Sequence, residues 1–402
     1  DSLVSVIGCP FNHLIHQWEK DLKSMKINHE IIIADSTNPK WKNQISNKIL
    51  DINNKNKKFL TILTTHDTFS SPKFCNEIRK VKSDLFLIMD EVHGIGTPLR
   101  SKGLLDNYTY RLGLSATPER WFDKKGTKLI KDFFSETVYK FPLNKAINTI
   151  NVNTGKTYLT PYEYKPYFVE LNDSELMEYK KITKKIVKAY FGSKKEDSLN
   201  ISSLYFKRQK IINEALNKLK VLKNIIRENK LEHCLVYCSS KQIKPIQEIL
   251  NQKGIVQHKF TMKEGIKKSD EFGGESERGL ILKKFSEGFY KVLVAIKCLD
   301  EGVDIPSAKI AIIMSSTSNP IQYIQRRGRI LRRSYNKEKA VIYDMIVIPG
   351  FDILKDDYIR DFELKIIRKE FQRYKEFALS ADNALECLKL LEDMELKYDL
   401  SL

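Results

Sequence analysis

Short apolar runs recur along the first third of the chain, separated by stretches in which apolar residues have helical spacing. A run that is apolar at nearly every position indicates a strand buried on both faces of a sheet. The clearest such run covers residues 84–89. The pattern predicts further strands at 3–9, 30–34, 59–64 and 110–114. Strands that alternate with helices predict a mainly parallel sheet, so the first part of the chain is expected to be an α/β domain.

A second series of alternating strand and helix patterns follows a stretch of different composition. Residues 151–232 begin with an aromatic, proline-containing stretch and continue as long, Lys-rich helical patterns. The strand pattern then returns at 234–238, 255–260, 292–296, 310–314 and 340–348, with helical patterns between these runs. We therefore expect an α/β domain at 1–150, a helical connector at 151–232, a second α/β domain at 233–350 and a C-terminal helical segment at 351–402. The last segment suggests no chemistry of its own.

Composition narrows the class of protein. The 402 residues are 42% hydrophobic and 30% charged, which is typical of a soluble globular protein with two or three domains. The net charge of +18 favours a polyanionic partner, with nucleic acid first. No apolar run reaches the length of a membrane helix, and no secretory leader is visible.

The cysteines indicate a reducing compartment. They are scattered, and most lie inside apolar runs, which predicts reduced core thiols in a cytoplasmic protein rather than disulfides or a zinc site. The six are Cys9, Cys75, Cys234, Cys238, Cys298 and Cys387.

Two carboxylates stand at the end of the clearest strand, in the run Asp90-Glu91-Val92-His93. Functional groups of parallel α/β sheets gather beyond the carboxyl ends of the strands. A nucleotide triphosphatase needs one carboxylate to hold Mg²⁺, here Asp90 through water, and one to act on the attacking water, here Glu91. A carboxylate pair at a strand end is common, so this motif alone does not decide the function.

Hydroxyl groups follow other predicted strands. Ser115 and Thr117 follow the strand at 110–114, where they could change hydrogen-bond partners as a nucleotide turns over. Hydroxyls and helix N-termini at strand ends also suit phosphodiester oxygens. The candidate nucleic-acid contacts are Pro10, Thr64, Thr65, Ser239 and Ser240. Taken singly, a residue of this kind at a strand end is more often a helix cap.

A basic helix is predicted after Asn319-Pro320, a typical helix start. Residues 322, 325, 329 and 332 fall at three- and four-residue steps, so Gln325, Arg329 and Arg332 are expected to share one face suited to a polyanion. A solvated basic helix is the alternative.

Another candidate motif lies upstream of this helix, at residues 301–306. Gly302 allows backbone to approach a ligand closely, and Asp304 could bond a ribose. A tight turn that needs glycine is the alternative.

Four of these motifs together resemble a known family. They are Asp90-Glu91-Val92-His93, Ser115-Ala116-Thr117-Pro118, Glu301-Gly302-Val303-Asp304-Ile305-Pro306 and Gln325-Arg326-Arg327-Gly328-Arg329-Ile330-Leu331-Arg332. In order and spacing they resemble the superfamily 2 helicases and translocases, over roughly residues 1–350. The DEVH tetrad and the run ending at Arg120 look closest to the DEAH-like branch, which includes repair helicases and restriction or phage-defence motors.

The resemblance implies two RecA-like domains with parallel sheets, ATP and Mg²⁺ in the cleft between them and nucleic acid across their tops. In that family Arg329 and Arg332 match the arginine fingers, and Gln325 matches the residue beside the γ-phosphate. His93, Ser115 and Thr117 would couple hydrolysis to movement. Gly302 and Asp304 would contact the nucleotide. The expected function is ATP-dependent DNA translocation in restriction, phage defence or repair.

One family motif is not in the sequence. No G-x-x-x-x-G-K-[ST] phosphate loop occurs, so we expect ATP hydrolysis only if that loop lies upstream of residue 1 or comes from a partner chain. Such a partner could also supply a nuclease. Two other hypotheses stay open: a nucleic-acid-binding or sensor subunit with an incomplete ATP site, and an RNA helicase in place of a DNA helicase.

Overall fold

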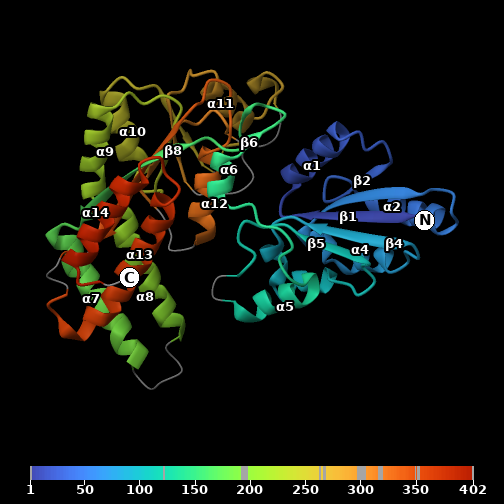
Figure 1. The fold of residues 1–402 in the computed structure, drawn as a ribbon, viewed down its shortest axis with the longest axis horizontal. Helices are drawn as coiled ribbons and strands as arrows, with labels where there is room; N and C mark the ends of the chain where they lie inside the picture. Colours follow the sequence, from blue (N-terminus) through green and yellow to red (C-terminus); the bar gives the residue numbers. More distant parts are fainter. Residues whose placement is uncertain are drawn as a thin grey trace. The chain divides into compact units, whose positions relative to one another are not determined.

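The computed structural model divides into two compact units, Asp1–Lys140 and Phe141–Leu402, which are described separately (Figure 1). The division falls at residues 140–141, whereas the sequence pattern suggested 150. The structure describes residues 2–120, 123–191, 198–261, 264–265, 269–296, 305–315, 320–348, 350 and 354–400.

Unit 1 is built on a five-stranded parallel sheet in the order β2-β3-β1-β4-β5. Its strands are β1 (Leu3–Cys9), β2 (Ile31–Ala34), β3 (Phe59–Thr65), β4 (Asp84–Met89) and β5 (Tyr110–Gly113). Its helices are α1 (Asn12–Ser24), α2 (Trp41–Asn53), α3 (His66–Phe69), α4 (Pro72–Ile78), α5 (Lys124–Phe134), η1 (Val92–Gly96) and η2 (Arg100–Gly103). All five strands predicted from the apolar runs are confirmed.

Both faces of this sheet are covered, which explains the uninterrupted apolar runs. Val4 and Val6 of β1 pack in one apolar cluster with residues of α2 and α4. Ile7 and Cys9 of the same strand pack in another, with Ile15 of α1. Neighbouring residues of a strand point to opposite faces, so each face needs its own apolar set.

Unit 2 contains a six-stranded sheet in the order β10-β11-β9-β12-β13-β8, again with every pair parallel. Its strands are β8 (Tyr162–Glu170), β9 (Cys234–Tyr237), β10 (Gln257–Phe260), β11 (Val292–Ala295), β12 (Ile310–Ile313) and β13 (Ala340–Ile348). A separate antiparallel pair is formed by β6 (Ile150–Asn151) and β7 (Lys156–Thr157). The predicted connector 151–232 thus contains a strand, β8, that pairs along its whole length with β13.

The helices of unit 2 include those expected in the connector and in the tail. They are α6 (Leu143–Asn148), α7 (Asp173–Phe191), α8 (Ser198–Glu214), α9 (Asn217–Glu228), α10 (Ile243–Gln252), η4 (Asp270–Phe272), α11 (Glu277–Ser286), α12 (Pro320–Ile330), α13 (Asp357–Ala378) and α14 (Ala384–Lys397).

The C-terminal helices belong to the core of unit 2. Figure 1 shows α13 beside α7, and α13 also packs against α14. Tyr374 and Phe377 of α13 are fully buried, and their ring centroids lie 5.3 and 5.4 Å from that of Tyr164 on β8. The segment predicted as 351–402 is therefore packed into the second unit.

The same helices cover the outer edge of β8. The side-chain amide of Asn383 accepts a hydrogen bond from Tyr164 N and donates one to Tyr164 O, both at 2.9 Å. Asp382 N donates to Tyr162 O at 2.8 Å. An edge strand normally presents unpaired backbone groups, and here the tail satisfies several of them.

A buried ion pair links the sheet of unit 2 to α13. Asp344 of β13 is fully buried, and its Oδ2 accepts a hydrogen bond from the Tyr164 hydroxyl at 2.9 Å. Arg373 of α13, 5% exposed, places Nη2 at 3.4 Å from the same oxygen and at 3.1 Å from Glu370 Oε2. The charge of Asp344 is therefore compensated by groups from β8 and α13.

Five of the six cysteines are buried free thiols, as predicted, and Cys298 lies outside the described residues. Among the described helices, none is long and apolar enough to cross a bilayer.

Candidate functional site

The carboxylate pair lies where three strands of unit 1 end together. Asp90 N donates to Gly8 O at 2.8 Å, which ties the end of β4 to β1. Val92 N donates to Leu114 O at 2.9 Å, which ties it to the residue after β5. The position of Asp90 and Glu91 is thus fixed by backbone hydrogen bonds on both sides.

Asp90 is held by two hydrogen bonds. Its Oδ1 accepts from Glu91 N at 2.9 Å, and its Oδ2 accepts from the Trp18 indole at 3.2 Å. Burial raises the pKa of Asp90, and the indole hydrogen bond opposes that rise. In the sequence, Trp18 is only part of a helical pattern, and nothing relates it to a carboxylate 72 residues away.

Glu91 has a strained backbone. Its φ of 48° and ψ of 52° lie in the left-handed region, which costs a non-glycine residue about 1–3 kcal/mol. Gly94 N donates to Glu91 O at 2.8 Å, and this turn holds the conformation. A strained residue persists only where its surroundings impose it, and such residues cluster at functional sites. The strain therefore supports an active role for the Glu91 carboxylate.

His93 connects the ends of β4 and β5. Its Nδ1 lies 3.2 Å from Ser115 Oγ, with hydrogen-bond geometry. The same nitrogen lies 3.3 Å from Glu91 Oε2, but that oxygen makes no hydrogen bond to a described residue, so we assign the hydrogen bond to Ser115. Thr117 N donates to Ser115 Oγ at 3.0 Å. The three residues predicted to couple hydrolysis to movement thus lie in one hydrogen-bonded group next to Glu91.

A buried histidine supports the strand end that carries Asp90. The sequence did not identify it as a site residue. His66, fully buried, lies 2.9 Å from Asp90 O through Nε2. Because a carbonyl only accepts, Nε2 carries the proton, and Nδ1 makes no hydrogen bond to a described residue. Burial lowers the pKa of His66 from 6.5 to about 4.

We expect this histidine to make unit 1 sensitive to acid. The folded pKa lies below the unfolded value, so the unfolded chain binds the extra proton, and stability falls as the pH drops from 6.5 towards about 4. The full effect is about 3 kcal/mol. All three tryptophans lie in residues 1–140, so tryptophan fluorescence during urea unfolding follows this unit. His66→Gln should flatten the pH dependence, and His16→Gln, at an exposed position, should leave it unchanged. An equal slope in His66→Gln would contradict this assignment.

The predicted nucleic-acid contacts of unit 1 differ in how accessible they are to a ligand. Thr64 is fully buried and donates its hydroxyl to Ala34 O at 2.9 Å, so it has no surface for a phosphate and the expectation for this residue is corrected. Thr65 is half-buried and caps α3 by accepting from Thr68 N at 3.2 Å. Pro10 is half-buried at the end of β1.

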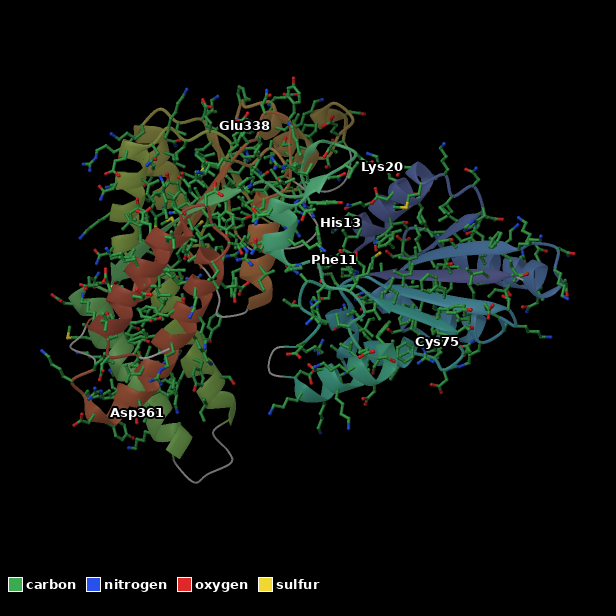
Figure 2. All side chains as sticks on the ribbon, in the orientation of Figure 1. Phe11, His13, Lys20, Cys75, Glu338 and Asp361 are labelled. Atoms are coloured by element: carbon green, nitrogen blue, oxygen red, sulfur yellow. The ribbon has the colours of Figure 1, made fainter. Side chains whose placement is uncertain are left out.

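An exposed aromatic pair follows Pro10. Phe11 and His13 stack with ring centroids 5.7 Å apart and an interplanar angle of 11° (Figure 2). Phe11 occupies the N-cap of α1, a position where a hydroxyl or carboxylate side chain is usual, and provides no side-chain cap. This pair was not among the predicted contacts, although Phe at a cap position is a signal that the sequence does contain.

In unit 2, the predicted serines follow β9. Ser240 is exposed, whereas Ser239 is half-buried, and its Oγ has no hydrogen-bond partner among the described residues. Ser239 N donates to Gln242 Oε1 at 3.1 Å, which closes the turn into α10. The two serines therefore lie at a strand end as predicted, with Ser240 the more accessible.

The basic helix α12 has the predicted division into faces. Tyr323, Ile330 and Leu331 are buried in the core of unit 2, whereas Gln325 and Arg329 are half-exposed. Arg332 departs from the prediction because α12 ends at Ile330. Buried Lys337 donates to the carbonyls of Ile330 and Arg332, at the end of the helix and just beyond it.

The two other arginines of this segment are structural. Arg326 donates to Ser315 O at 2.7 Å and lies over the ring of Tyr237. Arg327 donates to Glu376 Oε1 at 2.8 Å and lies over the ring of Phe377 on α13. These contacts position α12. Arg329 is the arginine of this helix that is half-exposed.

Some predicted features lie elsewhere. Gly302 and Asp304 are outside the described residues. Gly155-Lys156-Thr157 shares its letters with the end of a phosphate loop, but it lies in the β6–β7 hairpin and leads into no helix N-terminus that could bind phosphate.

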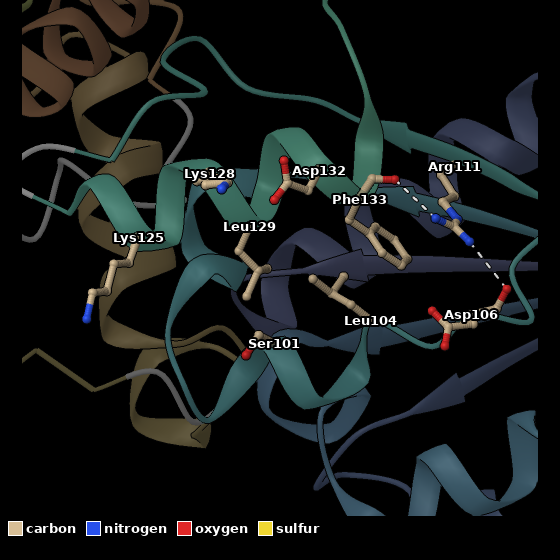
Figure 3. A pocket seen from close by; sticks show the side chains of 9 residues that line it. All are labelled: Ser101, Leu104, Asp106, Arg111, Lys125, Lys128, Leu129, Asp132 and Phe133. Carbon is tan, nitrogen blue, oxygen red and sulfur yellow. Dashed lines mark hydrogen bonds between the residues drawn. The ribbon is translucent and has the colours of Figure 1, made fainter.

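A pocket of about 530 Å³ in unit 1 is separate from the carboxylates (Figure 3). It lies against η2, β5 and α5, and Arg111 in its wall donates to the backbone carbonyls of Asp106 and Phe133. None of the predicted site residues lines it.

The residues at Asp90 fit a magnesium ion bound through water. The described residues include no cluster of three or more potential metal ligands. Mg²⁺ usually takes only one or two carboxylates and completes its octahedron with water and substrate phosphates. A single anchored carboxylate is therefore sufficient for that mode of binding.

Two family models match this chain. The Type III restriction enzyme res subunit matches residues 6–120, and the helicase conserved C-terminal domain matches residues 217–334. The region matched by the first model contains the carboxylate pair and the Ser115 group, and the region matched by the second contains α12. The chain belongs to the superfamily 2 helicases. Its two parallel-sheet units are RecA-like domains, as the resemblance implied.

Curated relatives agree with this membership of superfamily 2. The chain is 30% identical over 284 residues to the DNA 3'-5' translocase XPB2 of Sulfurisphaera tokodaii, covering 66% of this chain and 58% of that protein. It is 28% identical over 287 residues to Putative helicase 22 of Sulfolobus islandicus filamentous virus, covering 69% and 46%. The chain thus spans about half the length of these relatives.

A solved structure supports the fold. The ATP-dependent Type ISP restriction-modification enzyme LlaBIII bound to DNA matches with a TM-score of 0.53 and 13% identity, over 91% of this chain and 26% of that one. At this identity the match shows the fold alone.

Proposed function

We propose that this superfamily 2 chain is the motor core of an ATP-dependent DNA translocase or helicase. The observation that carries the proposal is the corner of unit 1. There a strained, anchored Glu91 lies beside Asp90 and beside the hydrogen-bonded group of His93, Ser115 and Thr117. In unit 2, the half-exposed Arg329 of α12 is the proposed arginine finger.

Each residue has a distinct task in this proposal. Glu91 orients and deprotonates the water that attacks the γ-phosphate. Asp90 would hold Mg²⁺ through water, and the ion would neutralise charge on the phosphates. Arg329 and Arg332 would stabilise charge that develops in the transition state, and Gln325 matches the family's residue for the γ-phosphate. The phosphate-loop lysine that completes such a site is not among these 402 residues.

The hydrogen bond between His93 and Ser115 provides the coupling. The two residues follow neighbouring strands, and His93 Nδ1 also lies 3.3 Å from Glu91 Oε2. A change of charge at Glu91 during turnover would favour a different partner for the imidazole. That exchange would move Ser115 and Thr117 and so transmit hydrolysis to the rest of unit 1.

DNA is the proposed track. Pro10, Thr65, Ser239 and Ser240 lie at strand ends, where hydroxyls and backbone N–H groups suit phosphate oxygens. Contacts to the backbone and a net charge of +18 predict strong salt dependence and little sequence preference. The first relative's name specifies a DNA translocase, and the res-subunit match favours restriction, phage defence or repair.

We expect the native protein to release phosphate from ATP faster when DNA is present. The measurement compares no polymer, single-stranded DNA, duplex DNA and RNA at one salt concentration. Stimulation by DNA well above that by RNA supports the proposal, and the more effective DNA form identifies the track. Equal, low rates with all polymers, together with measurable DNA binding, would favour a binding or sensor subunit.

A further inference from the structure

Aromatic residues gather at the amino ends of two strands of unit 2. His258 is the second residue of β10, and Tyr290 lies two residues before β11. Because all strands of this sheet are parallel, their amino ends lie along the same side of it. Ser240 and α12 follow the carboxyl ends of β9 and β12. The aromatic residues are therefore at the opposite end of the sheet from the proposed DNA and nucleotide contacts.

Three of these side chains, His258, Phe289 and Tyr290, form an aromatic cluster. The ring centroids of His258 and Tyr290 lie 5.1 Å apart, and those of Tyr290 and Phe289 also lie 5.1 Å apart. Tyr290 is half-buried against the core of unit 2, so it anchors the other two rings. Phe289 is 58% exposed, and Lys284 Nζ lies 5.4 Å from its ring centroid. The cluster thus presents an apolar surface that the core holds in place.

The surroundings of the aromatic cluster are basic. Residues 253–259 contain two lysines and no acidic residue, and residues 284–291 contain two lysines and one glutamate. One of these lysines, Lys291, lies beside the chain that carries Phe289, since a Cβ at Gly288 would be 3.9 Å from Lys291 Nζ. A partner that places negative charges around an apolar group is complementary to this surface.

The aromatic cluster adjoins an open edge of the sheet. β10 is the outermost strand, and among the described strands only β11 pairs with it. The carbonyls of Val256 and Phe260 accept hydrogen bonds from the β11 side. Backbone groups alternate in direction along a strand, so the N–H groups of Gln257 and Lys259 point away from β11. An extended segment of another chain can pair with an edge of this kind.

We propose that the aromatic cluster and the β10 edge bind an extended acidic segment of a partner protein. The segment pairs its backbone with β10 and packs one aromatic or large aliphatic side chain against Phe289. Its carboxylates lie beside the four lysines of residues 253–259 and 284–291. The proposal goes beyond the proposed function, because it assigns a second surface whose ligand is neither ATP nor DNA.

Two observations favour a protein segment over nucleic acid. The ring planes of Phe289 and Tyr290 lie at 76° to each other, so they form a corner rather than a flat platform on which successive bases stack. The aromatic cluster is also at the amino ends of the strands, away from the strand ends proposed to contact DNA. A partner bound here would leave those strand ends accessible.

Binding of two defined peptides tests this surface. The first probe is a fluorescein-labelled peptide of aspartate and glutamate residues with one central phenylalanine, and the second has serine in place of that phenylalanine. By fluorescence anisotropy, the native protein should bind the phenylalanine peptide about tenfold more tightly than the serine peptide. Phe289→Ser should remove this difference. Equal affinities of the native protein for the two peptides, or an unchanged difference in Phe289→Ser, would overturn the proposal.

Phe206→Ser is the matched control. Phe206 is 73% exposed on α8 of the same unit, so the same substitution removes a similar apolar surface outside the aromatic cluster. This variant should keep the native difference between the two peptides. Both positions are exposed, so both variants should fold like the native protein by circular dichroism. An equal loss of peptide binding in the two variants would contradict a specific role for Phe289.

A DNA measurement separates this surface from the proposed function. Phe289→Ser should bind a single-stranded oligonucleotide as the native protein does, and its DNA-stimulated phosphate release should stay close to native. If Phe289→Ser lost affinity for DNA as strongly as for the phenylalanine peptide, the aromatic cluster would be a nucleic-acid contact and the proposal would be wrong. Absence of DNA stimulation in the native protein would overturn the proposed function and leave the peptide result unaffected.

Substitutions at Lys259 test the pairing with β10. Lys259→Pro removes an N–H group that points away from β11, at an edge position where the sheet tolerates proline. Lys259→Ala removes the same positive charge and keeps the N–H group. Lys259→Pro should therefore bind the phenylalanine peptide several-fold more weakly than Lys259→Ala. Equal affinities of these two variants would overturn the proposed strand pairing.

Discussion

Glu91→Gln is expected to lower DNA-stimulated ATP hydrolysis by about 10²- to 10⁴-fold, because the amide keeps the shape of the side chain and cannot accept a proton. The strained backbone at φ 48° should be retained, since Gly94 and Val92 fix it through main-chain hydrogen bonds. The loss should therefore appear in kcat, with ATP and DNA binding preserved. The measurement compares the rates of phosphate release by the native protein and by Glu91→Gln at saturating DNA and ATP.

Glu119→Gln is the control for this variant. Glu119 lies four residues after Ser115, has a 71% exposed side chain and pairs with Lys131 at 2.7 Å. Removing this carboxylate changes the net charge by the same amount and should leave kcat close to wild type. Wild-type turnover in Glu91→Gln would remove Glu91 from the mechanism, and an equal loss in both variants would point to a charge effect rather than a local role.

Arg373→Met is expected to destabilise unit 2 by about 3–5 kcal/mol, because it leaves the buried Asp344 carboxylate without its cation. The methionine keeps most of the apolar length of the side chain, so the loss comes from the charge. Circular dichroism in urea follows both units, and tryptophan fluorescence follows unit 1 alone, so a shift seen by circular dichroism and not by fluorescence belongs to unit 2. Arg360→Met, at an exposed position of the same helix, should change the midpoint little.

The pair can also be removed as a whole. Replacing both partners of a buried ion pair by apolar residues is often neutral, whereas removing one is costly. Arg373→Met with Asp344→Leu should therefore recover much of the stability lost in Arg373→Met alone. A double variant no more stable than the single one would show that the Tyr164 hydroxyl, rather than the lost cation, controls this part of the core.

The strands could be predicted from the sequence where burial imposes a simple pattern. The strand 84–89 is covered on both faces, so nearly every residue is apolar. β8 was not predicted as a strand because Pro166 interrupts it and its aromatic residues alternate with charged ones. The structure explains the proline: β8 is an edge strand, where a missing N–H is tolerated.

The site could be predicted only where its residues are close in sequence. Asp90, Glu91 and His93 form one run, and Ser115 with Thr117 another, so the topology of a parallel sheet was enough to bring them together. Trp18 and His66 support Asp90 from other elements, and only folding creates those contacts. The helical period placed Arg332 on the face of Arg329, because nothing in the sequence indicates that α12 ends at Ile330.

The packing of α13 and α14 has a consequence for how this motor can be divided or recombined. The helicase C-terminal family model stops at residue 334, yet the fold does not. A chimaera joined at that point would lose β13, the partner of β8, and Glu376, the partner of Arg327. It would also uncover the edge that Asn383 satisfies, a surface on which strands of other chains could add. The second domain therefore includes the C-terminal helices. Domain exchanges between relatives should be made at residues 140–141.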